Sequence, residues 1–213
     1  MLPGFQLYVI TDRRLAPAGD LPGLLARALA ELPAGLVGVQ LREKDLGARD
    51  LCDLAREVLT VTRRAGAPLL INDRLDVALA VRADGVHLAG HSLPPREARE
   101  LLGPERLLGA SAHSLAEARA AQEAGCDFAT FGPVFATPSK ARYGPPVGLE
   151  PLREACAELA TFPLLALGGV ELANASSCRA AGARGVAVIR AVLTAADPSR
   201  ACRELITATH AGR

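Results

Sequence analysis

Eight short apolar runs alternate with segments rich in Ala, Leu, Arg and Glu along the whole chain, and this alternation restricts the fold more than any other feature. Several runs are continuously apolar, which is typical of strands covered on both faces of a parallel sheet. Repeated strand–helix units of this kind predict an α/β protein. The strands are expected at residues 6–10, 36–42, 69–72, 85–88, 107–111, 128–131, 163–166 and 185–189.

The intervening segments predict helices at residues 21–31, 48–65, 75–81, 95–102, 115–124, 150–159, 174–181 and 198–209. Three of them end in Ala-Gly just before the next strand, where glycine can adopt the left-handed conformation that closes a helix. Eight such units in 213 residues predict a single-domain (β/α)8 TIM barrel over residues 1–213. An open, doubly wound sheet is the alternative.

Composition argues against several classes of partner. A net charge of +1, with five Phe, two Tyr and no Trp, offers neither a basic face nor an aromatic platform for nucleic acid. No apolar run approaches the roughly 18 residues that a membrane-spanning helix needs. The first residues show no basic stretch ahead of an apolar one, so we expect no signal peptide and a cytoplasmic protein. The five scattered cysteines are expected to be reduced.

Polar residues gather where the predicted strands end, which is where the active sites of such barrels lie. Gln40, Arg42 and Lys44 occupy alternate positions at the end of the second strand and should point the same way. An Arg fork with a neighbouring Lys suits a phosphate or another anion. The alternative is that Arg42 and Lys44 pair with Glu43, Asp45 or residues of neighbouring helices.

Asn72 and Asp73 end the third predicted strand. Asp73 could hold Mg²⁺ bound to a substrate phosphate, because Mg²⁺ in proteins commonly uses one or two carboxylates together with phosphate oxygens. Either residue could equally be an ordinary helix N-cap. The sequence does not separate the two roles.

Backbone groups suggest a second anion site. Gly168 and Gly169 follow the seventh predicted strand, and Ile189 and Arg190 follow the eighth. Barrels of this type often bind phosphate with backbone N–H groups at these two strands. The alternative interpretation is a pair of tight turns.

A long stretch rich in Gly and Pro, residues 131–148, follows the sixth predicted strand. Connections longer than roughly 12–15 residues without secondary structure are usually functional. Thr137, Ser139 and Lys140 in this stretch suit an anionic ligand, which favours a binding loop or lid over a plain surface excursion.

The chain resembles the thiamin phosphate synthase and TenI superfamily over essentially its full length. The resemblance implies a (β/α)8 barrel, in agreement with the periodicity, and an enzyme that acts on a phosphorylated thiazole. It rests on segments that stand in the family's order at residues 7–12, 39–44, 71–74, 83–88, 109–114, 131–135, 137–140, 166–169 and 185–189.

In the synthases, a thiazole phosphate attacks a hydroxymethylpyrimidine diphosphate, and Mg²⁺ helps the diphosphate to leave. The resemblance implies Gln40 facing the pyrimidine, Asp73 on Mg²⁺ and Ser111 near the reacting centre. It also implies two groups of phosphate contacts: Arg42, Lys44, Asn72 and Lys140 for the diphosphate, and Thr137, Ser139, Gly169, Ile189 and Arg190 for the thiazole phosphate.

Two departures from the synthase pattern matter, and the first of them favours a different reaction. Where synthases carry a second acidic metal ligand this chain has Ser92, and Arg190 replaces a common Ser. TenI-type tautomerases move a proton of a carboxythiazole phosphate with a His in a motif that Ser111 to Ser114 match, and imidazole suits this at neutral pH. We therefore expect a thiazole tautomerase with His113 and Ser111 as catalytic residues and no cofactor.

Two alternatives remain at this point. The first is a thiamin phosphate synthase that requires Mg²⁺, and the second is a non-catalytic regulator that binds thiazole phosphate. A phosphorylated thiazole is the expected small-molecule partner in every case. A homo-oligomer is possible, and the sequence does not determine the number of subunits.

Overall fold

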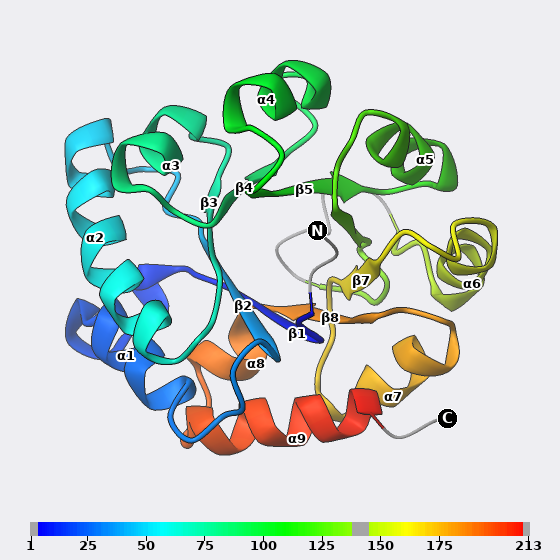
Figure 1. Ribbon diagram of the computed structural model, residues 1–213. Coiled ribbons are helices and arrows are strands. Elements are labelled where there is room, and N and C mark those ends of the chain that lie inside the picture. Colours follow the sequence, from blue (N-terminus) through cyan, green and yellow to red (C-terminus); the bar gives the residue numbers. More distant parts are fainter. Residues whose placement is uncertain (1–3, 138–144, 211–213) are drawn as a thin grey trace.

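The computed structural model describes residues 4–137 and 145–210, and its strands close into one barrel (Figure 1). The order around the barrel is β1 to β8, and β8 pairs in parallel with β1. This closure confirms the (β/α)8 prediction and rules out the open sheet. The strands are β1 Leu7–Ile10, β2 Val37–Leu41, β3 Leu69–Asn72, β4 Gly85–Leu88, β5 Leu107–Ala112, β6 Phe128–Phe131, β7 Leu164–Leu167 and β8 Gly185–Val188.

Helices surround the barrel in Figure 1; α1 to α7 each join one strand to the next, and α8 and α9 follow the last strand. They are α1 Leu21–Ala28, α2 Ala48–Arg64, α3 Leu75–Val81, α4 Pro95–Leu102, α5 Leu115–Glu123, α6 Leu149–Glu158, α7 Leu172–Ala180, α8 Arg190–Leu193 and α9 Pro198–His210, with 3-10 turns η1 Arg13–Leu15 and η2 Pro17–Gly19 after β1. None of the described helices is long and apolar enough to cross a membrane.

Two boundaries differ from the sequence prediction in ways that affect the site. β2 stops at Leu41, because the Arg42 N–H donates to Thr11 Oγ1 (2.9 Å) and leaves the strand ladder. α8 follows β8 directly, and its four residues are too few to show a helical period in the sequence. Ile189 and Arg190 therefore lie at the start of a short helix.

The barrel interior is filled with side chains. Phe5, Tyr8 and Phe128 pack with ring centroids 5.2–5.4 Å apart, among Ile10, Leu70, Leu165 and Ala187. Gly38 leaves the room that Phe5 occupies, since a Cβ at this position would lie 2.9 Å from the ring. This apolar layer forms a closed floor, so a ligand can enter only from the mouth where the strands end.

Candidate active site at the barrel mouth

A buried carboxylate fixes the segment that follows β2. Glu43 accepts hydrogen bonds from Thr11 Oγ1 (2.6 Å), from the Arg13 backbone N–H (3.1 Å) and from Arg13 Nη1 (3.2 Å). Arg13 also binds Asp45 through both terminal nitrogens, at 2.6 and 2.9 Å. Both acidic groups are thus held by residues after β1, so among the described residues Arg13 is the cationic partner that they share, and Arg42 is not.

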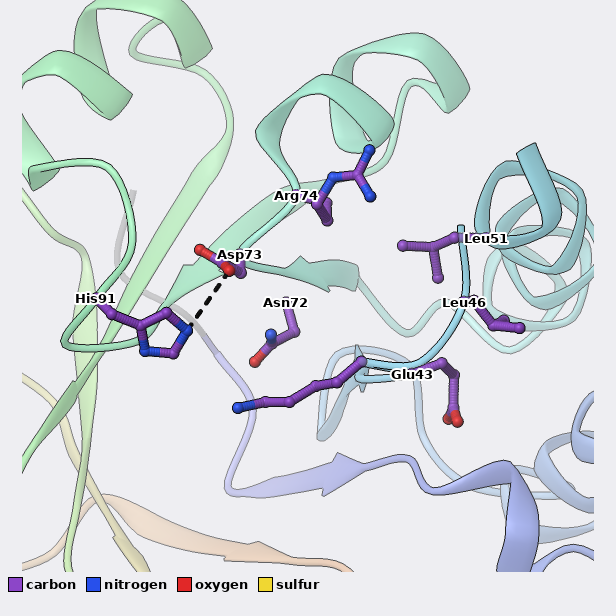
Figure 2. A pocket seen from close by; sticks show the side chains of 8 residues that line it. Glu43, Leu46, Leu51, Asn72, Asp73, Arg74 and His91 are labelled. Carbon is purple, nitrogen blue, oxygen red and sulfur yellow. Dashed lines mark ion pairs between the residues drawn. The ribbon is translucent and has the colours of Figure 1, made fainter. Parts of the chain in front are cut away.

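The sequence did not indicate that Glu43 binds Thr11 and Arg13; its charge suggested only a partner for Arg42 or Lys44. In Figure 2 its side chain points away from Asn72 and Asp73. Alternation along 42–44 places Glu43 on the opposite side from Arg42 and Lys44, and this was the signal that could have identified it. Its contacts with Thr11 and Arg13 join the ends of β1 and β2.

A pocket opens beside this segment, at the ends of β2, β3 and β4 (Figure 2). Its lining residues are Glu43, Lys44, Leu46, Leu51, Asn72, Asp73, Arg74 and His91. Three residues predicted from the sequence, Lys44, Asn72 and Asp73, therefore meet in one place. Arg42 does not line this pocket, although its charge reaches into the barrel and helps to lower the pKa of the buried His87.

Asp73 has a left-handed backbone, with φ of 65°. Its N–H donates to the His87 carbonyl across the sheet (2.9 Å). The N-cap position of α3 belongs to Arg74, without a side-chain capping bond, so neither Asn72 nor Asp73 is the ordinary N-cap of the alternative interpretation. A left-handed non-glycine residue costs roughly 1–2 kcal/mol and suggests a functional constraint.

The turn after β4 contains Ser92, the residue at the expected position of a second acidic metal ligand, and His91. Ser92 Oγ accepts the Ala89 N–H (2.7 Å), so its hydroxyl oxygen is used inside the turn. His91 instead faces Asp73, with Nε2 3.8 Å from Oδ2, as the dashed line in Figure 2 shows. The described residues contain no group of three or more His, Cys, Asp or Glu placed to hold a metal.

Polar groups also lie deeper, inside the barrel. Gln40 is only 2% exposed and lies beside Tyr8, whose pKa burial raises. His87 Nε2 lies 3.1 Å from Ser111 Oγ and 3.5 Å from Thr130 Oγ1. Burial lowers the pKa of His87 to about 3, with a further contribution from the charge of Arg42, so this imidazole is neutral at physiological pH.

His113 lies outside this interior cluster. Its side chain is 49% exposed, and Glu117 binds both its Nδ1 (3.0 Å) and its backbone N–H (2.7 Å). Ser114 accepts the Glu117 N–H and is the N-cap of α5. The structure thus gives His113 a place in the start of α5.

The mouth at β6 and β7 is built from closely packed backbone. Val134 and Phe135 donate N–H groups to the Leu167 and Gly168 carbonyls, at 2.8 and 2.9 Å. A Cβ at Gly168 would lie 2.5 Å from Pro133 Cβ, and one at Gly169 would lie 2.5 Å from the Ala136 carbonyl oxygen. Both glycines have a positive φ, 96° and 62°, and closely packed neighbours, and their contact with phosphate stays a prediction.

The remaining predicted residues lie near this side or beyond the described chain. Ile189 is the N-cap of α8 and Arg190 its first residue, at the end of β8. Thr137 is the last described residue before the gap, and Ser139 and Lys140 lie outside the described residues. Their predicted contact with an anion stays a prediction.

Comparison with known proteins agrees with the barrel. The family model described as thiamine monophosphate synthase matches residues 7–192. A putative thiamine-phosphate synthase of Geobacter sulfurreducens is 51% identical over 202 residues, covering 95% of this chain and 93% of the relative. The thiamine-phosphate synthase of Roseiflexus sp. is 48% identical, covering 95% and 84%. The structure of a Pyrococcus furiosus thiamine phosphate pyrophosphorylase superposes with a TM-score of 0.86 at 36% identity, covering 98% and 96%.

These relatives overturn the expectation of a TenI-type thiazole tautomerase. Sequences from 51% down to 41% identical carry the synthase name over nearly the whole chain. The expectation gave too much weight to Ser92, although Asp73 is in place beside His91. The catalytic proton relay assigned to His113 belonged to that reaction and is withdrawn with it. The chain belongs to the thiamine monophosphate synthase family.

Proposed function

We propose that the chain is a thiamine-phosphate synthase, a transferase that joins hydroxymethylpyrimidine diphosphate to thiazole phosphate and releases diphosphate. The observation that carries the proposal is the near full-length similarity to synthases at 41–51% identity. The pocket at β2 to β4 supports it, because Lys44, Asn72 and Asp73 lie together there.

In this reaction the bond between the pyrimidine methylene carbon and a diphosphate oxygen breaks. The diphosphate leaves with the bonding electron pair, and the thiazole nitrogen supplies the pair for the new C–N bond. Negative charge therefore grows on the leaving group, and preorganised donors around it lower the barrier. Arg42, Lys44, Asn72 and Lys140 are the proposed donors. The backbone N–H of Arg42 is held by Thr11 Oγ1, whose proton goes to Glu43.

The second substrate is proposed to bind on the other side of the mouth. Thr137, Ser139, Gly168, Gly169, Ile189 and Arg190 would contact its phosphate. Gln40 would face the pyrimidine, and Ser111 would lie near the reacting carbon. The closed floor of Phe5, Tyr8 and Phe128 supports this arrangement, because both substrates must then meet above it.

We also propose a divalent cation at Asp73. The donors present fit such an ion, since Mg²⁺ commonly uses one carboxylate with phosphate oxygens. Bound there, the cation would neutralise charge on the diphosphate. His91 lies beside Asp73, with Nε2 3.8 Å from Oδ2, and is the proposed second ligand.

The deciding experiment for the reaction is an assay of the purified protein. It is given both substrates with Mg²⁺, and thiamin phosphate and diphosphate are quantified. Formation of both products in equal amounts, dependent on each substrate, is expected. The absence of product at any Mg²⁺ concentration would refute the proposal, and Asp73→Asn is the control for background reaction.

The cation is tested separately, by the electron paramagnetic resonance signal of free Mn²⁺ titrated with protein and inorganic diphosphate. Asp73→Asn should abolish binding, and His91→Ser should weaken it severalfold. His210→Ser, at the end of α9, is the matched control. Equal binding by His91→Ser and wild type would show that His91 is not a ligand.

A further inference from the structure

His87 lies inside the barrel, below the pocket, and its two ring nitrogens have different surroundings. The residue is 2% exposed, with its ring 5.7 Å from that of Tyr8 and 5.8 Å from that of Phe128. Nε2 faces two hydroxyl groups, Ser111 Oγ at 3.1 Å and Thr130 Oγ1 at 3.5 Å. Nδ1 is buried without a hydrogen-bond partner among the described residues.

Gly109 explains the surroundings of Nδ1. It is paired with His87 across β4 and β5, and a Cβ at Gly109 would lie 2.7 Å from Nδ1 and 2.5 Å from Phe128 Cζ. The direction from Gly109 toward Nδ1 is therefore occupied by a C–H group, which accepts no hydrogen bond. Any larger residue at 109 would displace the imidazole or the Phe128 ring.

These contacts select one tautomer of the neutral ring. A proton on Nδ1 would be buried against carbon, and an unsatisfied buried N–H is costly. A proton on Nε2 instead meets Ser111 Oγ at hydrogen-bonding distance. The Nε2–H form is thus favoured on geometry, and Ser111 Oγ accepts this proton.

The tautomer determines what Ser111 can offer a ligand. A hydroxyl has one donor and two acceptor positions. With Nε2–H on one acceptor position, the Ser111 proton has to point elsewhere. Ser111 is partly exposed near the end of β5, where the barrel opens.

We propose that His87, backed by Gly109, is a positioning residue that makes the Ser111 hydroxyl a hydrogen-bond donor toward the bound substrate. The inference rests on the proposed synthase function, because the acceptor is an electronegative atom of the pyrimidine diphosphate. Thr130 is the second acceptor of the Nε2 proton, which keeps the ring in place when Ser111 moves. His87 itself does not touch the substrate and transfers no proton.

The tautomer is measured directly, with no need for activity. Protein labelled with ¹⁵N in its histidine rings is examined by long-range ¹H–¹⁵N correlation, and His87 is assigned from the spectrum of His87→Gln. A protonated Nε2 and an unprotonated Nδ1 are expected. The opposite tautomer would overturn the inference, because Ser111 would then donate to His87.

The effect on catalysis is measured by a double-mutant cycle between His87 and Ser111. Ser111→Ala should lower kcat by about 10²-fold, the effect typical of losing one preorganised donor. His87→Leu should lower kcat by about tenfold, since the hydroxyl remains but is no longer oriented. In the Ser111→Ala background, His87→Leu should have no further effect. An equal loss in both backgrounds would mean that His87 only supports the fold.

His87→Gln completes the test, because its amide can place an N–H near the position of Nε2. We expect it to restore most of the activity that His87→Leu loses. A Gln variant as slow as the Leu variant, with the same melting temperature as wild type, would contradict the positioning role. Lack of synthase activity in the wild type would refute the proposed function and leave the tautomer measurement standing.

Discussion

The two halves of the barrel mouth are built differently. After β1 to β4, charged side chains connect the strand ends: Glu43 holds Thr11 and Arg13, and Asp73 faces His91. After β6 and β7, the described contacts are mainly between backbone groups, with Gly168 and Gly169 packed on residues 133–136. The first half therefore offers charged side chains to a ligand, whereas the binding of a phosphate by the second half stays a prediction. This difference suits a reaction with one diphosphate and one monophosphate substrate.

The largest effect should come from removing the carboxylate that organises the first half. Glu43→Ala leaves the buried Thr11 hydroxyl and two N–H donors of Arg13 without their acceptor, and each buried donor left unsatisfied costs about 1–3 kcal/mol. Asp45→Ala is the matched control, because it removes only the exposed partner of Arg13 and should cost clearly less than Glu43→Ala. Urea unfolding measures both. Similar costs would show that the burial of Glu43 does not matter.

A second prediction separates the two halves by substrate. Arg42→Ala should raise the KM for the pyrimidine diphosphate by about 10- to 100-fold, the range expected for losing a hydrogen bond between charged groups. Arg190→Ala should raise the KM for the thiazole phosphate by a smaller factor, because its site relies on backbone groups. Steady-state kinetics with each substrate varied in turn decides this. Equal effects of either variant on both substrates would break the comparison.

The buried His87, inside the barrel, should make the free energy of unfolding depend on pH. The pKa of His87 is lowered by burial to about 3, from an ordinary value of 6.5. Below pH 6.5 the unfolded chain takes up a proton on this residue that the folded chain does not. The contribution of His87 to the free energy of unfolding is therefore fully present above pH 6.5 and is lost as the pH is lowered toward 3. At pH 5 this amounts to about 2 kcal/mol, at 1.36 kcal/mol per pH unit.

The comparison variant for this prediction is His87→Gln, which has no titrating ring. The free energy of unfolding, measured in urea at pH 7 and pH 5, should fall less for His87→Gln than for wild type. The groups that face His87 are Tyr8, Phe128, Ser111 and Thr130, with Arg42 acting through its charge. Identical pH dependence in the two proteins would show that His87 is not buried in neutral form.

Much of the fold could be predicted because it depends on local pattern. Continuously apolar runs marked the strands, and Ala-Gly pairs marked helix ends, as at Ala124 and Gly125. The contacts of Glu43 could not be predicted from local sequence, because its partners, Thr11 and Arg13, are some 30 positions away. Local sequence could not show that the Asp73 carboxylate meets His91, since β4 and its turn bring the two together. His113 was chosen for its chemistry, and only the structure revealed its binding to Glu117.

The smallest expected change in stability tests whether the backbone of Asp73, in the first half of the mouth, is strained. Asp73 and Arg82 both have left-handed backbones, with φ of 65° and 55°. Glycine relieves a cost of roughly 1–2 kcal/mol at such a position but adds about 0.5–1 kcal/mol of unfolded-chain entropy. Asp73→Gly and Arg82→Gly should therefore each stabilise the protein by up to about 1 kcal/mol in urea unfolding. Arg82 ends α3, away from the pocket, so only Asp73→Gly should also lose Mn²⁺ binding. If Asp73→Gly destabilises the protein while Arg82→Gly stabilises it, the left-handed Asp73 contributes to the fold and is not a strained group kept for the cation.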